Sequence, residues 1–225
     1  MIRLVLFDID GTLVHTGGAG VTAFAKVFAE EFGAVDGFER LKFAGRTDLS
    51  MVREFFEFHR IEATPENFQR FFHRYVFCLD YILGHSKTEM CPGIPQFIAR
   101  LKALQPAPLL GLLTGNVRLG AEIKLRHFNL WDEFETGAFA DDSEDRDQIA
   151  AIARDRGSRV LGRALAAEEV LVIGDTALDI RCGRAIGARV LAVATGGARL
   201  EELNRHQPDW AVNDLARISA KKVCR

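Results

Sequence analysis

The sequence lacks the features that mark membrane, secreted and nucleic-acid-binding proteins. Its longest apolar runs, such as 109–113 and 190–194, are far shorter than the roughly 20 residues of a membrane span. The apolar start ends at Asp8, too early for the core of a signal peptide. Lys and Arg (29) nearly balance Asp and Glu (31), and there is no basic tract. We therefore expect a cytoplasmic protein with neither a nucleic acid nor a membrane as partner.

Cysteine is also scarce. The four cysteines form no Cys-x-x-Cys pair and have no metal-ligand spacing; they are Cys78, Cys91, Cys182 and Cys224. This scatter predicts buried, reduced thiols rather than disulfides or a zinc site.

Hydrophobic residues (48%) and charged residues (27%) occur in globular proportions, which excludes a disordered or collagen-like chain. A chain of 225 residues suits one large domain, or a medium domain that carries an insert.

Phenylalanine is concentrated in one part of the chain. Twelve of the 17 phenylalanines lie between Gly17 and Ser86. Within this segment apolar residues recur at steps of three and four along 21–32, 51–56 and 68–83, which predicts three amphipathic helices. Thr64 before Pro65 is a plausible N-cap for the third. The segment therefore predicts a small helical bundle.

The rest of the chain alternates between two patterns. Short apolar runs predict strands at 4–7, 109–113, 170–173 and 190–194, and helical patterns occur near 94–104, 121–128, 148–156 and 178–186. Near-continuous apolar strands separated by helices are typical of a parallel sheet covered on both faces. The predicted fold class is α/β: a Rossmann-like parallel sheet core, residues 1–16 and 87–225, with an inserted helical-bundle cap domain, residues 17–86.

Acidic residues follow two of the predicted strands. Asp8 and Asp10 crowd the end of the first, before Gly11, and Asp175 follows the third, with Asp179 at the start of the next helix. An isolated Asp-x-Asp-Gly is more often a solvated turn, and Asp179 alone suits a helix N-terminus. Ligands of open parallel sheets bind at the carboxyl ends of the strands, so Asp8, Asp10 and Asp175 should converge there. Carboxylates without His or Cys ligands favour Mg²⁺.

The strand predicted at 109–113 ends in neutral polar groups. Thr114, Gly115 and Asn116 supply a hydroxyl, a close-approach glycine and an amide just before a helix. Alone they would be more typical of an N-cap and turn. Beside the acidic strand ends, at a helix N-terminus that attracts anions, they predict a phosphate-holding loop.

Taken together, these motifs resemble those of the haloacid dehalogenase-like hydrolases, in their phosphatase branch. Residues 8–12 (Asp-Ile-Asp-Gly-Thr) look like the family's first motif, 113–116 like its second and 174–179 like its fourth, and the helical insert matches its type-1 cap. The resemblance implies a Mg²⁺-dependent phosphatase acting on a small-molecule phosphate ester, with phosphoglycolate phosphatase as the nearest named activity.

The resemblance also implies a covalent route. Asp8 would attack phosphorus to form an aspartyl-phosphate, and Asp10 would protonate the leaving oxygen and then activate water. Mg²⁺ would be held by Asp8, the carbonyl of Asp10, and Asp175, with Asp179 supporting from nearby. Thr114 joins the catalytic residues, and we assign Thr12, Gly115 and Asn116 to substrate binding.

The third motif departs from the family's common pattern. It usually supplies a lysine, but no lysine occurs between Lys124 and Lys221. We assign the role to Arg146, in the acidic stretch 141–147, with Arg154 as the fallback. The alternative for Arg146 is a surface ion pair with its acidic neighbours, which would contribute little to stability. An arginine retains the positive charge and can bridge a phosphate and a carboxylate.

Within the insert, Gly45-Arg46-Thr47 resembles the turn that the family's caps place over the active site. Arg46 is therefore a candidate contact for an anionic substrate, although Thr47 or Asp48 could simply cap the helix that follows.

Three other functions compete with the phosphatase. A sugar-phosphate mutase similar to beta-phosphoglucomutase keeps both acids and a similar cap, so it is the runner-up. A dehalogenase would lack the second acid, and Asp10 argues against it. A phosphorylatable receiver-type signalling module also gathers acids at strand ends, but it has neither the insert nor an acid two residues after the first. The sequence predicts no particular substrate or oligomeric state.

Overall fold

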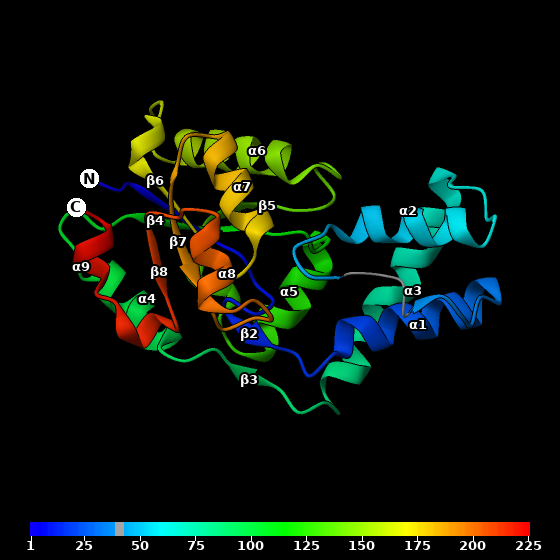
Figure 1. The fold of residues 1–225 in the computed structure, drawn as a ribbon. Coiled ribbons are helices and arrows are strands. Elements are labelled where there is room, and N and C mark those ends of the chain that lie inside the picture. The colour runs from blue at the N-terminus through cyan, green and yellow to red at the C-terminus, as the bar shows by residue number, and fades with distance from the viewer. Residues whose placement is uncertain (39–42) are drawn as a thin grey trace.

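A computed structural model describes residues 1–38 and 43–225. Its centre is a six-stranded sheet in the order β5-β4-β1-β6-β7-β8, with every neighbouring pair parallel. The strands are β1 (Leu4–Phe7), β4 (Leu109–Leu113), β5 (Thr136–Ala138), β6 (Val170–Gly174), β7 (Arg189–Val193) and β8 (Trp210–Val212). Figure 1 shows helices on both sides of this sheet and a separate group of helices standing apart from it. The predicted α/β class is confirmed.

Alternation along β1 explains why the sheet is covered on both faces. Val5 and Phe7 belong to a hydrophobic cluster with residues of α4 (Ile94–Lys102), α5 (Arg118–His127) and α9 (Ala220–Val223). Leu4 and Leu6 belong to a second cluster, on the opposite face, with α6 (Arg146–Val160) and α7 (Ala177–Ala185). Helix α8 (Leu200–Arg205) packs beside α7. Successive strand residues point to opposite faces, so a four-residue apolar strand serves both cores.

The inserted segment is helical, as predicted, and forms a cap. It contains α1 (Ala19–Phe32), α2 (Asp48–Phe58) and α3 (Pro65–Leu83). Its core is largely aromatic: the ring of Phe28 lies 4.0 Å from that of Phe55 and 4.5 Å from that of Phe71, centroid to centroid. Thr64 caps α3 by accepting a hydrogen bond from the Asn67 N–H, with Pro65 in the first turn. The prediction that Thr64 is the N-cap of this helix is therefore confirmed.

Two short strands join the cap to the core. β2 (Val14–His15) pairs antiparallel with β3 (Glu89–Met90), so the chain leaves and re-enters the core at one place. This pair lies beside the boundaries expected at 16/17 and 86/87, which we retain as a proposal for the domain limits.

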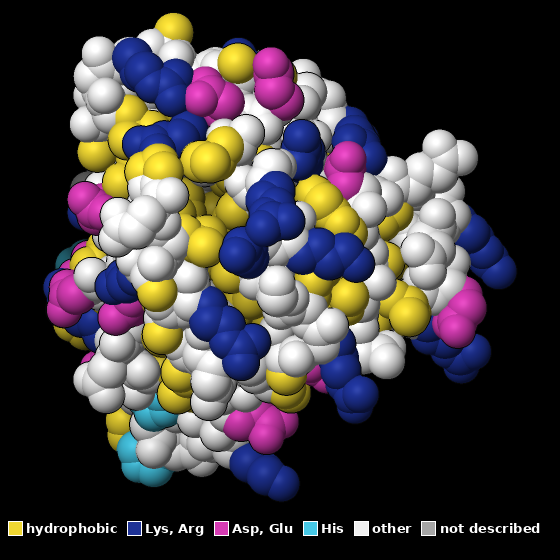
Figure 2. All heavy atoms as spheres, turned by 90° about the vertical axis from the view of Figure 1, so that its left-hand side faces the viewer, with side chains coloured by type: hydrophobic (Ala, Val, Ile, Leu, Met, Phe, Trp, Pro, Cys, Tyr) yellow, Lys and Arg dark blue, Asp and Glu magenta, His cyan; other side chains and the backbone are white. Residues whose placement is uncertain are grey.

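The two termini lie at the other end of the core. The Ile2 N–H donates to the Cys224 carbonyl. Figure 2 views the molecule from this end: Lys and Arg side chains occupy much of the middle of the face, with Asp and Glu nearer its edges. All four cysteines are free and buried, as expected. Among the described residues, no helix combines the length and apolar character needed to cross a membrane.

The cap docks onto the core through the first turn of α2. Thr47 caps α2 by accepting from the Ser50 N–H, and its hydroxyl donates to the Glu144 carbonyl at 3.0 Å. The Asp48 N–H donates to the Gly115 carbonyl at 2.7 Å, and the Asp48 carboxylate accepts from the Val117 N–H at 2.8 Å. The predicted helix-capping role of Thr47 is thus confirmed, and the same turn fastens the cap to the core.

Gly115 is needed at this junction because the two backbones almost touch. A Cβ on Gly115 would lie 2.1 Å from the carbonyl oxygen of Arg46. Any side chain would therefore displace the cap turn.

The Asp48 carboxyl is buried, and its surroundings on balance disfavour its ionised form. Burial raises its pKa to about 7, although the Lys124 charge and the Val117 N–H favour the ionised form, and Asp10 and Asp141 oppose it. Its usual value is 3.8. Between these two values the folded state retains a proton that the unfolded state has released, so this group makes the protein less stable as pH rises through that window.

Asp48→Asn should remove this pH dependence, because the amide oxygen can still accept the Val117 N–H but does not titrate. The free energy of unfolding of the variant, relative to that of wild type, should therefore be larger at about pH 8 than at about pH 5. The increase should be a few kcal/mol at most, since one pKa unit corresponds to about 1.4 kcal/mol. Urea unfolding of both proteins at both pH values measures the difference. An offset that is the same at both would contradict the assignment of the titration to Asp48.

Candidate active site

Three buried carboxylates meet at the carboxyl edge of the sheet. Asp8 directly follows β1 and Asp175 directly follows β6, and these strands are neighbours, with Phe7 opposite Ile173. Asp179 lies in the first turn of α7, where it forms a capping box with Thr176. Oxygens of Asp8, Asp175 and Asp179 lie within 4.8 Å of one another. The structure thus brings Asp8 and Asp175 together, as the strand ends predicted, with Asp179 beside them.

The acids can approach because glycines surround them. Gly11 has φ 82°, and a Cβ there would lie 2.7 Å from a carboxylate oxygen of Asp175. A Cβ on Gly196 would lie 1.7 Å from the same oxygen. Asp175 is thereby enclosed by backbone, and its other carboxylate oxygen accepts the Thr12 hydroxyl at 3.0 Å.

Burial and mutual repulsion disfavour the ionised forms of the acids in this cluster. Burial, and then repulsion by Asp179, raise the pKa of Asp8 to about 7, against the Arg146 charge that lowers it. Burial and repulsion by Asp179 and Asp8 raise the pKa of Asp175 to about 8, although the Thr12 hydroxyl lowers it. Without a further cation the cluster therefore favours protonated carboxyls near neutral pH.

A divalent cation fits this environment. The three side chains offer only oxygen ligands, as Mg²⁺ prefers, and a cation between them would remove the repulsion that raises their pKa values. The donor chemistry and the spacing of the cluster are therefore consistent with a magnesium site.

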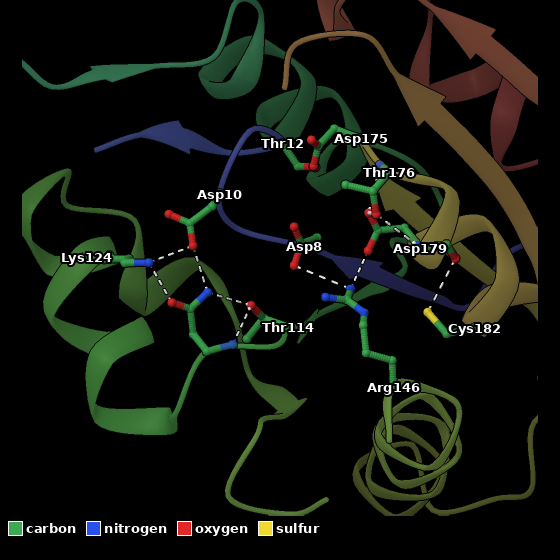
Figure 3. Close-up of polar contacts among 11 residues, drawn as sticks. Asp8, Asp10, Thr12, Thr114, Lys124, Arg146, Asp175, Thr176, Asp179 and Cys182 are labelled. Carbon is green, nitrogen blue, oxygen red and sulfur yellow. Dashed lines mark hydrogen bonds and ion pairs between the residues drawn. The ribbon is translucent and has the colours of Figure 1, made fainter. Parts of the chain in front are cut away.

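Arg146 supplies a positive charge from within the protein. It begins α6, is 4% exposed, and its Nη2 forms an ion pair with Asp179 and lies 3.6 Å from Asp8 Oδ1. Figure 3 shows the guanidinium group reaching between these two acids. Arg146 is therefore buried and does not form a surface ion pair with its acidic neighbours in the sequence. The fallback, Arg154, is elsewhere, donating to the Ile186 carbonyl.

Asp10 belongs to a second polar cluster, on the other side of Asp8 in Figure 3. Its Oδ2 accepts from Asn116 Nδ2 at 2.8 Å and from Lys124 Nζ at 2.6 Å. The Asp10 side chain is 42% exposed, against 8% for Asp8. The carboxylate of Asp10 is therefore held apart from the three-acid cluster, open to the cavity.

The predicted phosphate-holding loop lies between the two clusters. Thr114 is fully buried, and its Oγ accepts from both the backbone and the side-chain nitrogen of Asn116. Because that oxygen accepts both bonds, the hydroxyl proton of Thr114 is left to donate elsewhere. Gly115 and Asn116 line the cavity above it.

The structure distributes the other predicted substrate contacts unevenly. Thr12 is buried beneath the cavity, with its hydroxyl committed to Asp175. Arg46 lines the cavity, but its guanidinium pairs with Glu54 and donates to the Ser50 carbonyl at 3.4 Å. Thr12 thus has the geometry to orient Asp175, and Arg46 borders the site with its charge already partnered.

A cavity of about 340 Å³ lies between cap and core. Core acids line one side, and cap residues, among them Phe24, Asp48 and Tyr75, line the other. The volume suits a small-molecule ligand.

Lys124 is the site residue that sequence reasoning missed. It lies on α5, is 4% exposed, and contacts Asp10 and Asn116. A signal was present: Lys124 follows Ala121 by three positions and precedes Leu125, so it occupies the buried face of an amphipathic helix. A lysine on such a face needs a partner.

Comparison with known proteins agrees with this geometry. Residues 5–193 match the model of the haloacid dehalogenase-like hydrolases. The chain is similar to a phosphoglycolate phosphatase of Chromobacterium violaceum, with 28% identity over 225 residues that cover 96% of this chain and 95% of that protein.

Solved structures share the fold. A predicted phosphoglycolate phosphatase from Haemophilus somnus superposes with a TM-score of 0.76 at 18% identity, covering 100% of this chain and 98% of that one. CbbY from Rhodobacter sphaeroides, in complex with phosphate, superposes with a TM-score of 0.75 at 20% identity, covering 96% of each chain. Since the family model spans most of the sequence, the chain belongs to the haloacid dehalogenase-like hydrolases, in the phosphatase branch that acts on phosphate monoesters.

Proposed function

We propose that the chain is a Mg²⁺-dependent phosphatase that hydrolyses a small-molecule phosphate monoester through an aspartyl-phosphate on Asp8. The observation that carries the proposal is the division of the acids. Asp8 lies buried beside Asp175 and Arg146, whereas Asp10 is held separately and is open to the cavity. One carboxylate thus suits attack on phosphorus, and the other suits proton transfer.

Asp8 attacks the phosphorus of the ester, a P–O bond forms to its carboxylate, and the bond to the leaving oxygen breaks. Asp10 gives that oxygen its proton, so the alcohol departs neutral. In the second step Asp10 takes a proton from water, the water oxygen attacks the phosphoryl group, and Asp8 is released with inorganic phosphate.

The neighbouring residues stabilise the charge that this reaction develops. Arg146, 3.6 Å from Asp8, offsets the negative charge of nucleophile and phosphoryl group. Its buried Nε has no hydrogen-bond partner among the described residues. The Thr114 hydroxyl, whose proton is left to donate, is suited to hold a phosphate oxygen.

Mg²⁺ would be held by Asp8, the Asp10 carbonyl and Asp175, and would supply positive charge to the phosphate oxygens. Asp179 has a supporting part in this scheme, because its two carboxylate oxygens already serve Arg146 and Thr176. Thr12 orients Asp175 through the 3.0 Å hydrogen bond.

The similarity to a phosphoglycolate phosphatase makes phosphoglycolate the first substrate to test. Arg46, at the cavity wall, is the candidate for contact with the carboxylate of such a substrate. A sugar-phosphate mutase uses the same acids, so analysis of sugar-phosphate isomers belongs in the same experiment.

Asp8→Asn should abolish turnover, because an amide is a poor nucleophile and a weaker Mg²⁺ ligand than a carboxylate. A chelator should silence the wild type, and added Mg²⁺ should restore it. Release of inorganic phosphate from a panel of small phosphate esters, with and without Mg²⁺, measures both effects.

Full activity in Asp8→Asn, or substantial turnover by metal-free wild type, would overturn the mechanism. Isomer formation with little release of phosphate would favour the mutase.

Asp10→Asn should separate the two chemical steps. An amide cannot activate water, so hydrolysis of the phosphoenzyme should slow by about 10²–10⁴-fold, the usual contribution of a positioned acid and base. Phosphoenzyme should then accumulate with esters that have good leaving groups. Rapid-quench labelling tests this, and unchanged turnover without trapped phosphoenzyme would remove Asp10 from the acid–base role.

A further inference from the structure

Lys124 is a buried cation that the proposed mechanism leaves without a task. Its side chain is 5% exposed, and burying an ammonium group is costly unless it is paired and hydrogen-bonded. The pairing is tight: Nζ lies 2.6 Å from Asp10 Oδ2 and 2.5 Å from Asn116 Oδ1. Lys124 therefore has its charge committed to the acid–base residue.

The hydrogen bonds divide the two oxygens of Asp10. Oδ2 accepts from both Lys124 Nζ and Asn116 Nδ2. Within residues 1–38 and 43–225, Oδ1 accepts no hydrogen bond from another side chain. One oxygen of the carboxylate is thus fixed and the other is available for proton exchange.

Asn116 alone cannot fix this arrangement. Its amide nitrogen is shared between Asp10 and Thr114, and its amide oxygen accepts from Lys124. Lys124 thereby sets which way the Asn116 amide faces as well as holding Asp10. Removing the ammonium group would take away one of the two donors to Asp10 Oδ2 and the Lys124 donor to Asn116 Oδ1.

The cap encloses this pair. A Cβ on Gly20, in α1, would lie 3.7 Å from Lys124 Nζ and 3.7 Å from the hydroxyl of Tyr75, in α3. Both cap residues line the cavity. Since charge interactions strengthen when water is excluded, the hold of Lys124 on Asp10 is strongest with the cap seated as it is here.

We propose that Lys124 is a positioning residue for the phosphatase reaction: it pins Oδ2 of Asp10, so that Oδ1 can deliver a proton to the leaving oxygen and later take one from water. This inference rests on the proposed function. It assigns Lys124 a task on the leaving-group side, distinct from that of Arg146 beside Asp8.

The test uses two esters that differ in their need for a proton. An alkyl ester such as phosphoglycolate needs its leaving oxygen protonated, whereas nitrophenolate leaves without help. Lys124→Met keeps the length of the side chain and removes the charge. Rapid-quench measurements should show phosphoenzyme formation slowed about 10–100-fold with the alkyl ester and hardly at all with nitrophenyl phosphate, a part of the usual acid–base contribution.

Both esters form the same phosphoenzyme. Its hydrolysis should therefore slow equally with the two esters. Lys124→Gln, which retains an N–H donor, should recover part of both rates. Arg126→Met is the matched control, because Arg126 lies on the same helix but is exposed and pairs with Glu122. This control should behave as wild type.

A second readout distinguishes positioning from packing. If Lys124 acts through Asp10, adding Lys124→Met to Asp10→Asn should cost little further rate, whereas a packing role would give an additional, independent loss. Equal slowing of phosphoenzyme formation with both esters, fully additive losses, or no effect would overturn the inference. Wild type that hydrolyses no ester would overturn the proposed function, and with it this inference, whereas an active wild type with an unaffected Lys124→Met overturns the inference alone.

Discussion

The crowding of carboxylates at one edge of the sheet is the constraint on which the site depends. Adjacent parallel strands β1 and β6 end side by side, so the acids that follow them are forced together in a buried place. Such charges are costly unless cations oppose them. Arg146 opposes Asp8 and Asp179, and Lys124 opposes Asp10. The remaining negative charge, on the Asp8 and Asp175 side, is what a divalent metal would balance.

This division of charge also explains why the cap has to meet the core closely. The α2 turn docks by backbone and side-chain hydrogen bonds from Thr47 and Asp48, at a point where only glycine fits in position 115. Docking covers Lys124 and narrows access to the acids. In a site from which water is excluded, fixed charges act on a bound phosphate more strongly than they would in solution.

The sequence predicted the parts of the molecule that local patterns determine. The central strands β1, β4, β6 and β7 are apolar runs that can be read directly, and Asp8, Thr114 and Asp175 follow strand ends. The edge strands β5 and β8, three residues each, were not predicted, because so short a segment has no usable periodicity. Lys124 was missed because its partner lies 114 positions away, and only tertiary packing brings the two together.

Arg46 illustrates how a partnered residue can still serve a substrate. Its ion pair with Glu54 joins side chains that are 27% and 46% exposed, and such pairs contribute about 0–1 kcal/mol. A charge-assisted hydrogen bond to a ligand carboxylate, shielded between cap and core, is worth more, roughly 1.5–3 kcal/mol. Exchanging Glu54 for a substrate carboxylate would therefore cost little and gain more. The observed pairing of Arg46 is thus compatible with the part we propose for it, because the partner it holds is one it can release.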